Sequence, residues 1–166
     1  MVLGLTFLGM VQAAELIGPG PVGGGLRTGD LWLALYADRL TEVSVSVVEQ
    51  AGERHWVVPG PTPLVLLRGE PLKAGPIKTY GASLTLSSAL NLGDLRLERK
   101  GAELEISDSE RRQRIPLMEG AQVLWAGDMD GDGHTDLILG HEGAWSLWIS
   151  SGSSYLLHEA GATTGC

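Results

Sequence analysis

Apolar and polar residues alternate with a period of two along most of the chain, and no stretch has the spacing of an amphipathic helix. Such alternation puts successive side chains on opposite faces of a strand, so it predicts short strands separated by turns. The predicted strands before residue 90 are Leu31–Ala37, Glu42–Glu49, His55–Val58, Leu64–Arg68, Ile77–Tyr80 and Ser83–Leu86. Val43, Val45 and Val47 share one face of their strand and are predicted to lie in the core.

The clearest sheet signal lies between Leu95 and Leu117, where turn residues join three alternating runs. We predict a three-stranded β-meander. Its apolar face consists of Leu95, Leu97, Leu104, Ile106, Ile115 and Leu117. Its other face carries Arg96 and Glu98, Glu103 and Glu105, and Arg112 and Arg114 on successive strands. Opposite charges are therefore predicted to pair across the strands. The alternative is an anion site formed by Arg111, Arg112 and Arg114.

Two segments precede this β-rich region. Residues 1–14 carry no charge, and the apolar run Val2–Val11 is followed by Gln12 and two alanines. This pattern is typical of a signal peptide with cleavage after Ala13 or Ala14, although a first buried strand is the alternative. Residues 15–30 are rich in glycine and proline and are predicted to be a loop or linker. The remaining residues, 31–166, are predicted to form a single all-β domain, either a sandwich or a twisted multi-sheet assembly.

Composition narrows the possible partners. The chain has 43% hydrophobic and 19% charged residues, which excludes intrinsic disorder, and no apolar run is long enough to span a bilayer. Its formal net charge of −8 argues against binding to nucleic acid or to anionic lipid. The only cysteine, Cys166, excludes an intramolecular disulfide and a multi-cysteine zinc site.

Candidate chemistry is concentrated in residues 128–136, which read D-x-D-G-D-G-x-x-D. Four carboxylates within nine residues repel one another in a compact turn unless a cation lies among them. Calcium suits such a loop, since it takes six to eight oxygen ligands. The predicted ligands are the carboxylates of Asp128, Asp130, Asp132 and Asp136 and the backbone carbonyl of His134, whose imidazole is expected to face solvent. The alternative is an acidic turn without a specific metal.

The flanks of the loop distinguish it from an EF-hand. Leu139 stands where an EF-hand has its bidentate glutamate, and the apolar runs 123–126 and 137–139 are of the strand type. We therefore expect a β-loop-β arrangement in which Gly131 and Gly133 adopt the positive φ that lets the chain wrap around an ion.

A family resemblance follows from Trp125-Ala126-Gly127-Asp128 and Asp136-Leu137-Ile138-Leu139-Gly140. Residues 123–151 resemble the FG-GAP or VCBS-type repeat of integrin α-chains and of many exported bacterial proteins. The resemblance implies calcium held between two strands by the five loop positions named above. A single copy does not make a propeller, and residues 144–151 resemble the tail of small exported bacterial proteins without an established activity.

No motif of a nucleophile, a zinc protease or a phosphate-binding loop occurs, so we predict that the protein is not an enzyme. The leading hypothesis is a secreted or periplasmic calcium-binding domain that acts as a structural or interaction module, with a protein or carbohydrate partner. A small hydrolase is the remotest alternative, and its candidate residues are His55, His134, His141 and His158.

A carbohydrate-binding module is the second hypothesis, because tryptophan is the dominant aromatic residue and exposed indoles stack on sugar rings. The five tryptophans are Trp32, Trp56, Trp125, Trp145 and Trp148. We expect core packing for most of them, with Trp32 and Trp145 as the exposed exceptions. Strand alternation also predicts that Trp145 and Trp148 point to opposite faces.

Overall fold

The computed structural model describes residues 14–141, 143–150 and 156–163. These residues form sixteen strands and no helix, which confirms the predicted all-β fold. Among them there is consequently no helix with the length and apolar character needed to cross a membrane. Apart from Ala14, the predicted signal peptide lies outside the described residues, as does Cys166.

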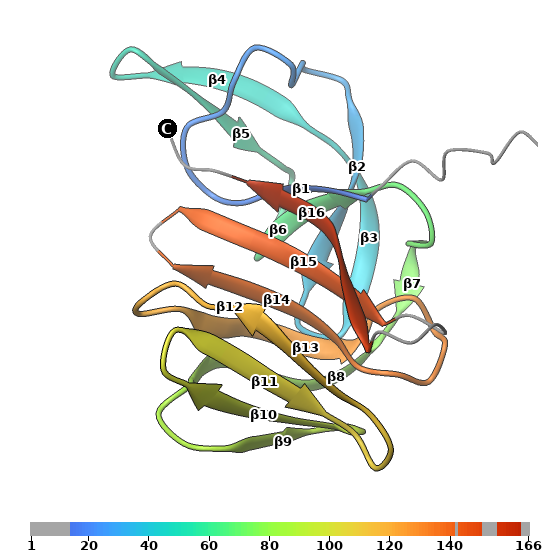
Figure 1. Ribbon diagram of the computed structural model, residues 1–166. Helices are drawn as coiled ribbons and strands as arrows, with labels where there is room; N and C mark the ends of the chain where they lie inside the picture. Colours follow the sequence, from blue (N-terminus) through green and yellow to red (C-terminus); the bar gives the residue numbers. More distant parts are fainter. Residues whose placement is uncertain (1–13, 142, 151–155, 164–166) are drawn as a thin grey trace, which may run out of the picture.

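Three stacked sheets and a separate hairpin make up the domain (Figure 1). The N-terminal sheet consists, in spatial order, of β1 (Glu15–Ile17), β6 (Val65–Arg68), β2 (Leu31–Tyr36), β3 (Arg39–Ser44) and β7 (Gly75–Pro76). The central sheet consists of β16 (Leu157–Thr163), β15 (Ala144–Ser150), β14 (Asp136–His141), β13 (Gln122–Asp128) and β8 (Lys78–Thr85). The meander sheet consists of β12 (Arg112–Pro116), β11 (Glu103–Ser107), β10 (Leu95–Lys100) and β9 (Leu90–Leu92), and the hairpin of β4 (Ser46–Gln50) and β5 (Glu53–Val57).

A hydrophobic cluster fills each space between these layers. Leu97, Leu104, Ile106, Val123 and Leu137 belong to the cluster between the meander and central sheets. Leu35, Leu67, Trp125, Ile138 and Leu147 belong to the cluster between the central and N-terminal sheets. A smaller cluster beneath the hairpin includes Trp32, Val45 and Trp56. The central sheet is thus covered on both faces, which explains why the apolar run at 137–139 is unbroken rather than alternating.

The predicted meander is confirmed. All six leucines and isoleucines assigned to its apolar face are buried. On the outer face, Glu105 pairs in register with Arg114, and their charged groups lie 3.2 Å apart. Arg112 is 3.8 Å from the same glutamate, and Arg111 lies 3.0 Å from Asp108 in the adjoining turn. The arginines that suggested an anion site are therefore paired with carboxylates of the same sheet.

The prediction of a loop or linker over residues 15–30 is wrong at its start. Glu15–Ile17 forms β1, which pairs with β6, and the side chain of Leu16 is buried. The glycine-rich part that follows is tied to the hairpin, because Trp56 Nε1 donates to the Gly18 carbonyl at 3.0 Å. The segment therefore belongs to the folded domain, which begins before residue 31.

The strand predicted over Glu42–Glu49 is divided between β3 and β4. The break falls at Val45, whose N–H donates to the carbonyl of Asp30 and whose carbonyl accepts from Gly29. Its backbone thus bonds to a loop instead of a sheet neighbour, and the chain leaves the N-terminal sheet for the hairpin. Val45 is nevertheless buried and Val43 and Val47 pack beside it, so the predicted core face is confirmed. Conversely, the two strands predicted between residues 77 and 86 form one strand, β8.

Candidate metal centre

The acidic loop joins β13 to β14 in the predicted β-loop-β arrangement. Asp128 is the last residue of β13 and Asp136 the first of β14, so the two strands fix the ends of the loop. Gly131 and Gly133 have φ values of +76° and +85°, which confirms the positive φ expected of them. Residues with a Cβ rarely adopt this conformation, so the two glycines allow the chain to turn back on itself.

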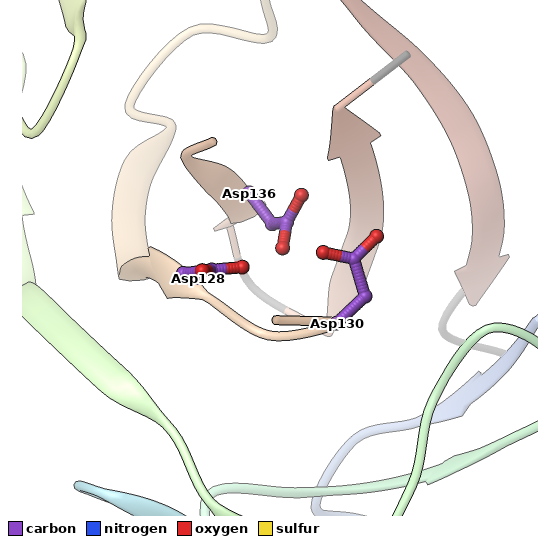
Figure 2. Close-up of side chains that lie close together, drawn as sticks. All are labelled: Asp128, Asp130 and Asp136. Atoms are coloured by element: carbon purple, nitrogen blue, oxygen red, sulfur yellow. The ribbon is translucent and has the colours of Figure 1, made fainter. Parts of the chain in front are cut away.

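Three carboxylates converge inside this turn (Figure 2). Asp128, Asp130 and Asp136 each offer one oxygen, and these oxygens all lie within 4.8 Å of one another. Two ligands on opposite sides of one calcium ion are separated by about 5 Å, twice the metal–oxygen distance. The spacing therefore fits three ligands of a single ion.

Backbone N–H groups donate to all three carboxylates, and the bond to Asp130 Oδ1, from Asp132 at 3.3 Å, is the longest of them. Asp128 Oδ1 accepts from the N–H of Gly131 at 2.9 Å, and its Oδ2 accepts from the N–H of Gly133 at 2.8 Å. The buried Asp136 accepts from the N–H groups of Met129 at 2.7 Å and Ser150 at 2.8 Å. These bonds orient the carboxylates before any ion arrives, which lowers the cost of forming the site.

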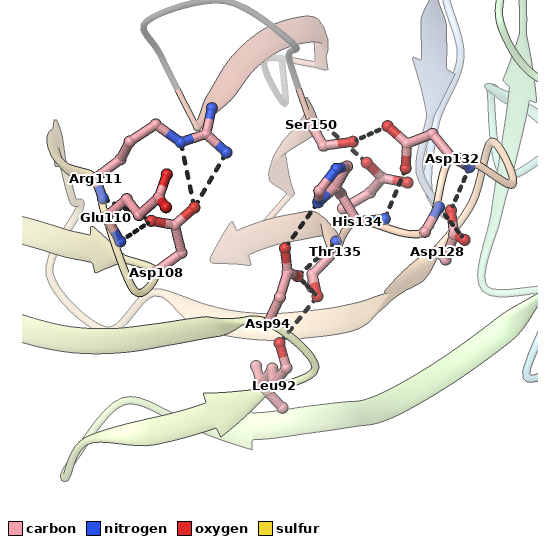
Figure 3. Close-up of polar contacts among 12 residues, drawn as sticks. Leu92, Asp94, Asp108, Glu110, Arg111, Asp128, Asp132, His134, Thr135 and Ser150 are labelled. Carbon is pink, nitrogen blue, oxygen red and sulfur yellow. Dashed lines mark hydrogen bonds and ion pairs between the residues drawn. The ribbon is translucent and has the colours of Figure 1, made fainter.

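Asp132, the fourth predicted carboxylate, lies outside the group of three. Its Oδ2 accepts a hydrogen bond from the Ser150 hydroxyl at 2.6 Å, and its Oδ1 accepts from the N–H of His134 at 2.8 Å (Figure 3). The structure therefore brings together three of the four carboxylates that the sequence singled out and uses Asp132 to attach the loop to the end of β15.

Burial, together with the neighbouring carboxylates, changes the affinity of this centre for protons. Burial, with a further contribution from the charge of Asp136, raises the pKa of Asp130 to about 7. Burial also raises the pKa of Asp136 to about 6, although hydrogen bonds from Ser150 and Met129 oppose the change. For Asp132 burial acts upward, but the bonds from Ser150 and His134 outweigh it and the pKa is lowered. Without a cation the centre thus retains protons near neutral pH, as expected where carboxylates lack a compensating positive charge.

The side chain of His134 is 55% exposed, as the sequence predicted. The sequence did not predict its partner, since Nδ1 lies 2.9 Å from Asp94 Oδ2. This hydrogen bond raises the pKa of His134. Since the pairing occupies the ring, any contribution of His134 to a metal would come from its backbone carbonyl, as the sequence predicted.

Asp94 is a residue of this centre that the sequence reasoning missed. It lies in the turn between β9 and β10, and its Oδ1 accepts from the N–H of Thr135 at 3.0 Å and lies 2.7 Å from the Thr135 hydroxyl (Figure 3). Burial alone would raise the pKa of Asp94, but the bonds from His134 and Thr135 bring it below the usual value. The carboxylate therefore attaches the meander sheet to the acidic loop.

Gly93 makes this attachment possible. Its φ is +61°, and a Cβ added there would lie 2.6 Å from Cε2 of Tyr80 and would also overlap the Thr135 hydroxyl. Only glycine lets the turn approach this closely. The one sequence signal was the dipeptide Gly93-Asp94, which is typical of a turn but does not indicate which distant segment the turn contacts.

All five tryptophans are buried or half-buried, and none is fully exposed. Trp32, expected to be exposed, is only 4% exposed, and Trp56 and Trp125 are also buried. Trp145 and Trp148 are half-buried and pack against different clusters, so their predicted placement on opposite faces of β15 is confirmed.

Comparison with known proteins adds no further assignment. No family model, curated protein or solved structure matches the chain. The resemblance of residues 123–151 to a calcium-binding repeat therefore stays a prediction.

Proposed function

We propose that this protein is a calcium-binding β-domain whose acidic loop holds one Ca²⁺. The observation that carries the proposal is the convergence of Asp128, Asp130 and Asp136 on a space small enough for one ion. Charged oxygens are the ligands that calcium prefers, and the loop spacing adds the carbonyl of His134. Asp132 is close enough in sequence to contribute through a water molecule, which calcium loops commonly include.

Calcium would act structurally. The loop lies where β13, β14, β15 and the β9–β10 turn meet, so an ion there would neutralise the repulsion between carboxylates that the fold holds together. A ligand that binds only the folded state stabilises it by about 2.7 kcal/mol at a hundredfold excess over its Kd. This amount is a substantial fraction of the stability of a typical domain.

The sequence extends the proposal to the setting in which the domain works. The signal-peptide-like segment and the resemblance to FG-GAP or VCBS-type repeats support an exported bacterial protein, secreted or periplasmic. In that setting the domain would serve as a structural or interaction module and not as an enzyme. Its net charge of −8 argues against nucleic acid as a partner.

A calcium titration of the full chain tests the proposal. The Tm is measured in EDTA and at increasing calcium for the wild type, Asp130→Asn and Asp136→Asn, with Asp38→Asn as a matched control in an exposed turn. We expect a saturable rise in Tm in the wild type and the control, and its loss in both loop variants. Asp132→Asn should weaken the effect less than Asp130→Asn. No calcium-dependent shift in the wild type would overturn the proposal.

A further inference from the structure

A groove of about 240 Å³ lies at the other end of β14 from the acidic loop. The loop adjoins Asp136 and the groove adjoins His141, so the length of the strand, roughly 17 Å, separates the two sites. The groove runs between β14–β16 and the chain that connects β12 to β13. Four of its lining residues matter for its chemistry: Met118, Ser146, Trp148 and Glu159.

Trp148 gives the groove a fixed aromatic wall. Its ring packs against the cluster between the central and meander sheets, and Nε1 donates to Ser146 Oγ at 2.9 Å. The hydrogen bond and the packing together hold the indole in one orientation. An aromatic side chain that is already fixed loses little conformational freedom when a ligand stacks against it.

A carboxylate lies beside this aromatic wall. Glu159 is the cross-strand partner of Trp148 in β16, and both line the groove. Glu159 is exposed, and no ion pair or hydrogen bond engages its carboxylate within the described part of the chain. Met118, which is 56% exposed, adds an apolar surface contributed by the β12–β13 connection. The groove thus combines a flat apolar surface with a hydrogen-bond acceptor at its edge.

We propose that this groove binds a pyranose ring of a carbohydrate. A pyranose has an apolar C–H face, which matches the indole of Trp148, and a rim of hydroxyls, which can donate to the carboxylate of Glu159 and bond to Ser146. The groove is smaller than the 300–1,000 Å³ common for drug-sized ligands, so it suits a single ring.

The rest of the described surface favours a small ligand over a protein partner. Besides Met118, the large exposed apolar residues are Leu31, Val48 and Val57, which lie on the N-terminal sheet and the hairpin. They do not extend the groove into a continuous apolar patch of the kind that marks an interaction site for an apolar protein surface. An adjoining hollow of about 330 Å³ shares Gly140, His141 and Trp145 with the groove and adds Gln122, so a second sugar unit would meet further polar groups.

Saturation-transfer NMR and tryptophan fluorescence on the full chain with excess calcium test the proposal. The probes are the methyl pyranosides of glucose, galactose, mannose and N-acetylglucosamine, with free indole as an apolar comparison. We expect at least one pyranoside to bind, with the strongest transfer to protons on one C–H face. Glu159→Gln should weaken that binding roughly tenfold, because the sugar hydroxyls then donate to a neutral amide oxygen instead of a charged carboxylate. Met118→Ala should weaken it severalfold.

Val57→Ala is the matched control, because it truncates an apolar side chain that is 45% exposed on a different layer. It should leave the binding unchanged, as should Asp38→Asn. Trp148→Ala should abolish binding, but its ring packs on the core, so this variant also loses stability. The exposed variants Glu159→Gln and Met118→Ala therefore decide the test. Two results would overturn the proposal: no pyranoside binds, whether or not indole does, or pyranoside binding is unchanged in both Glu159→Gln and Met118→Ala.

Discussion

Replacing Asp94 with alanine removes the contact that attaches the meander sheet to the acidic loop. The carboxylate accepts from the N–H of Thr135 at 3.0 Å and pairs with the imidazole of His134 at 2.9 Å. Thr135 is only 1% exposed, so its N–H has few routes to water once the carboxylate is gone. The substitution therefore leaves a buried backbone donor without its partner.

The two contacts give the expected size of the effect. A hydrogen bond to a charged acceptor contributes about 1.5–3 kcal/mol, and a partly exposed ion pair about 0–1 kcal/mol. We expect Asp94→Ala to lower the free energy of unfolding by about 2–3 kcal/mol. Asp94→Asn keeps an oxygen for the Thr135 N–H and loses only the charge, so it should cost about 1 kcal/mol.

Urea denaturation of both variants, with and without calcium, measures these losses, and Asp38→Ala is the exposed control. In a chain of this size the alanine variant should also lower the Tm by about 5–10 °C. A loss below about 0.5 kcal/mol, the size of an ordinary surface effect, would refute the role assigned to Asp94. Equal losses in the two variants would assign the effect to the charge rather than to the Thr135 N–H.

Three further predictions concern Gly93, the indole N–H of Trp56 and the competition between protons and calcium. In urea denaturation, Gly93→Ala should lower the free energy of unfolding by about 1–3 kcal/mol more than Gly101→Ala. The two residues have similar φ, +61° and +64°, but a Cβ at Gly93 would overlap other side chains and one at Gly101 would meet open space. Trp56→Phe should cost about 1 kcal/mol more than Trp32→Phe, because Trp56 Nε1 has an acceptor and the buried Nε1 of Trp32 has none in the described structure. Calcium should raise the Tm more at about pH 7.5 than at about pH 5, because protons compete for Asp130, whose pKa is raised to about 7. The same raised pKa means that the metal-free folded state binds a proton at Asp130 more tightly than the unfolded state does. The contribution of Asp130 to stability without metal therefore falls as the pH rises from about 4 to about 7.

Each of these predictions has an outcome that contradicts it. Equal losses at Gly93 and Gly101 would mean that backbone strain alone acts and that the close approach to the loop is unimportant. An equal or larger loss at Trp32 than at Trp56 would contradict the stabilising role assigned to the Trp56 N–H bond. A calcium shift of the same size at both pH values would contradict the competition between calcium and protons.

Local pattern was sufficient to predict the meander sheet. Its strands are joined by short turns, so the apolar face, the turn at Ser107–Glu110 and the Glu105–Arg114 pair all depend on residues close in sequence. The acidic loop was predictable for the same reason, because its nine residues contain the carboxylates and both glycines that shape it. In both cases the residues that form the pattern lie within one short segment, although Ser150 and Asp94 also bond to the acidic loop from outside it.

Features that depend on distant segments were not predictable in this way. β1 exists because Glu15–Ile17 pairs with β6, about fifty residues further along the chain, and glycine-rich flanks hid this strand. The break at Val45 depends on hydrogen bonds to Asp30 and Gly29. Asp94 contacts a loop 41 residues away, and nothing in its neighbourhood indicates the target. Trp32 was expected at the surface because the sequence does not reveal that the hairpin covers it.

The position of the acidic loop explains why one ion would affect more than one turn. Met129, the residue after Asp128, is 2% exposed in the cluster between the central and N-terminal sheets. Thr135, the residue before Asp136, is attached through Asp94 to the meander sheet on the other side. The proposed ligands thus lie between two anchor points, one in each layer interface. A cation that fixes the loop therefore acts on both interfaces at once, and repulsion among its carboxylates in the absence of a cation would weaken both. This is the physical reason to expect calcium to stabilise the whole domain instead of a single loop.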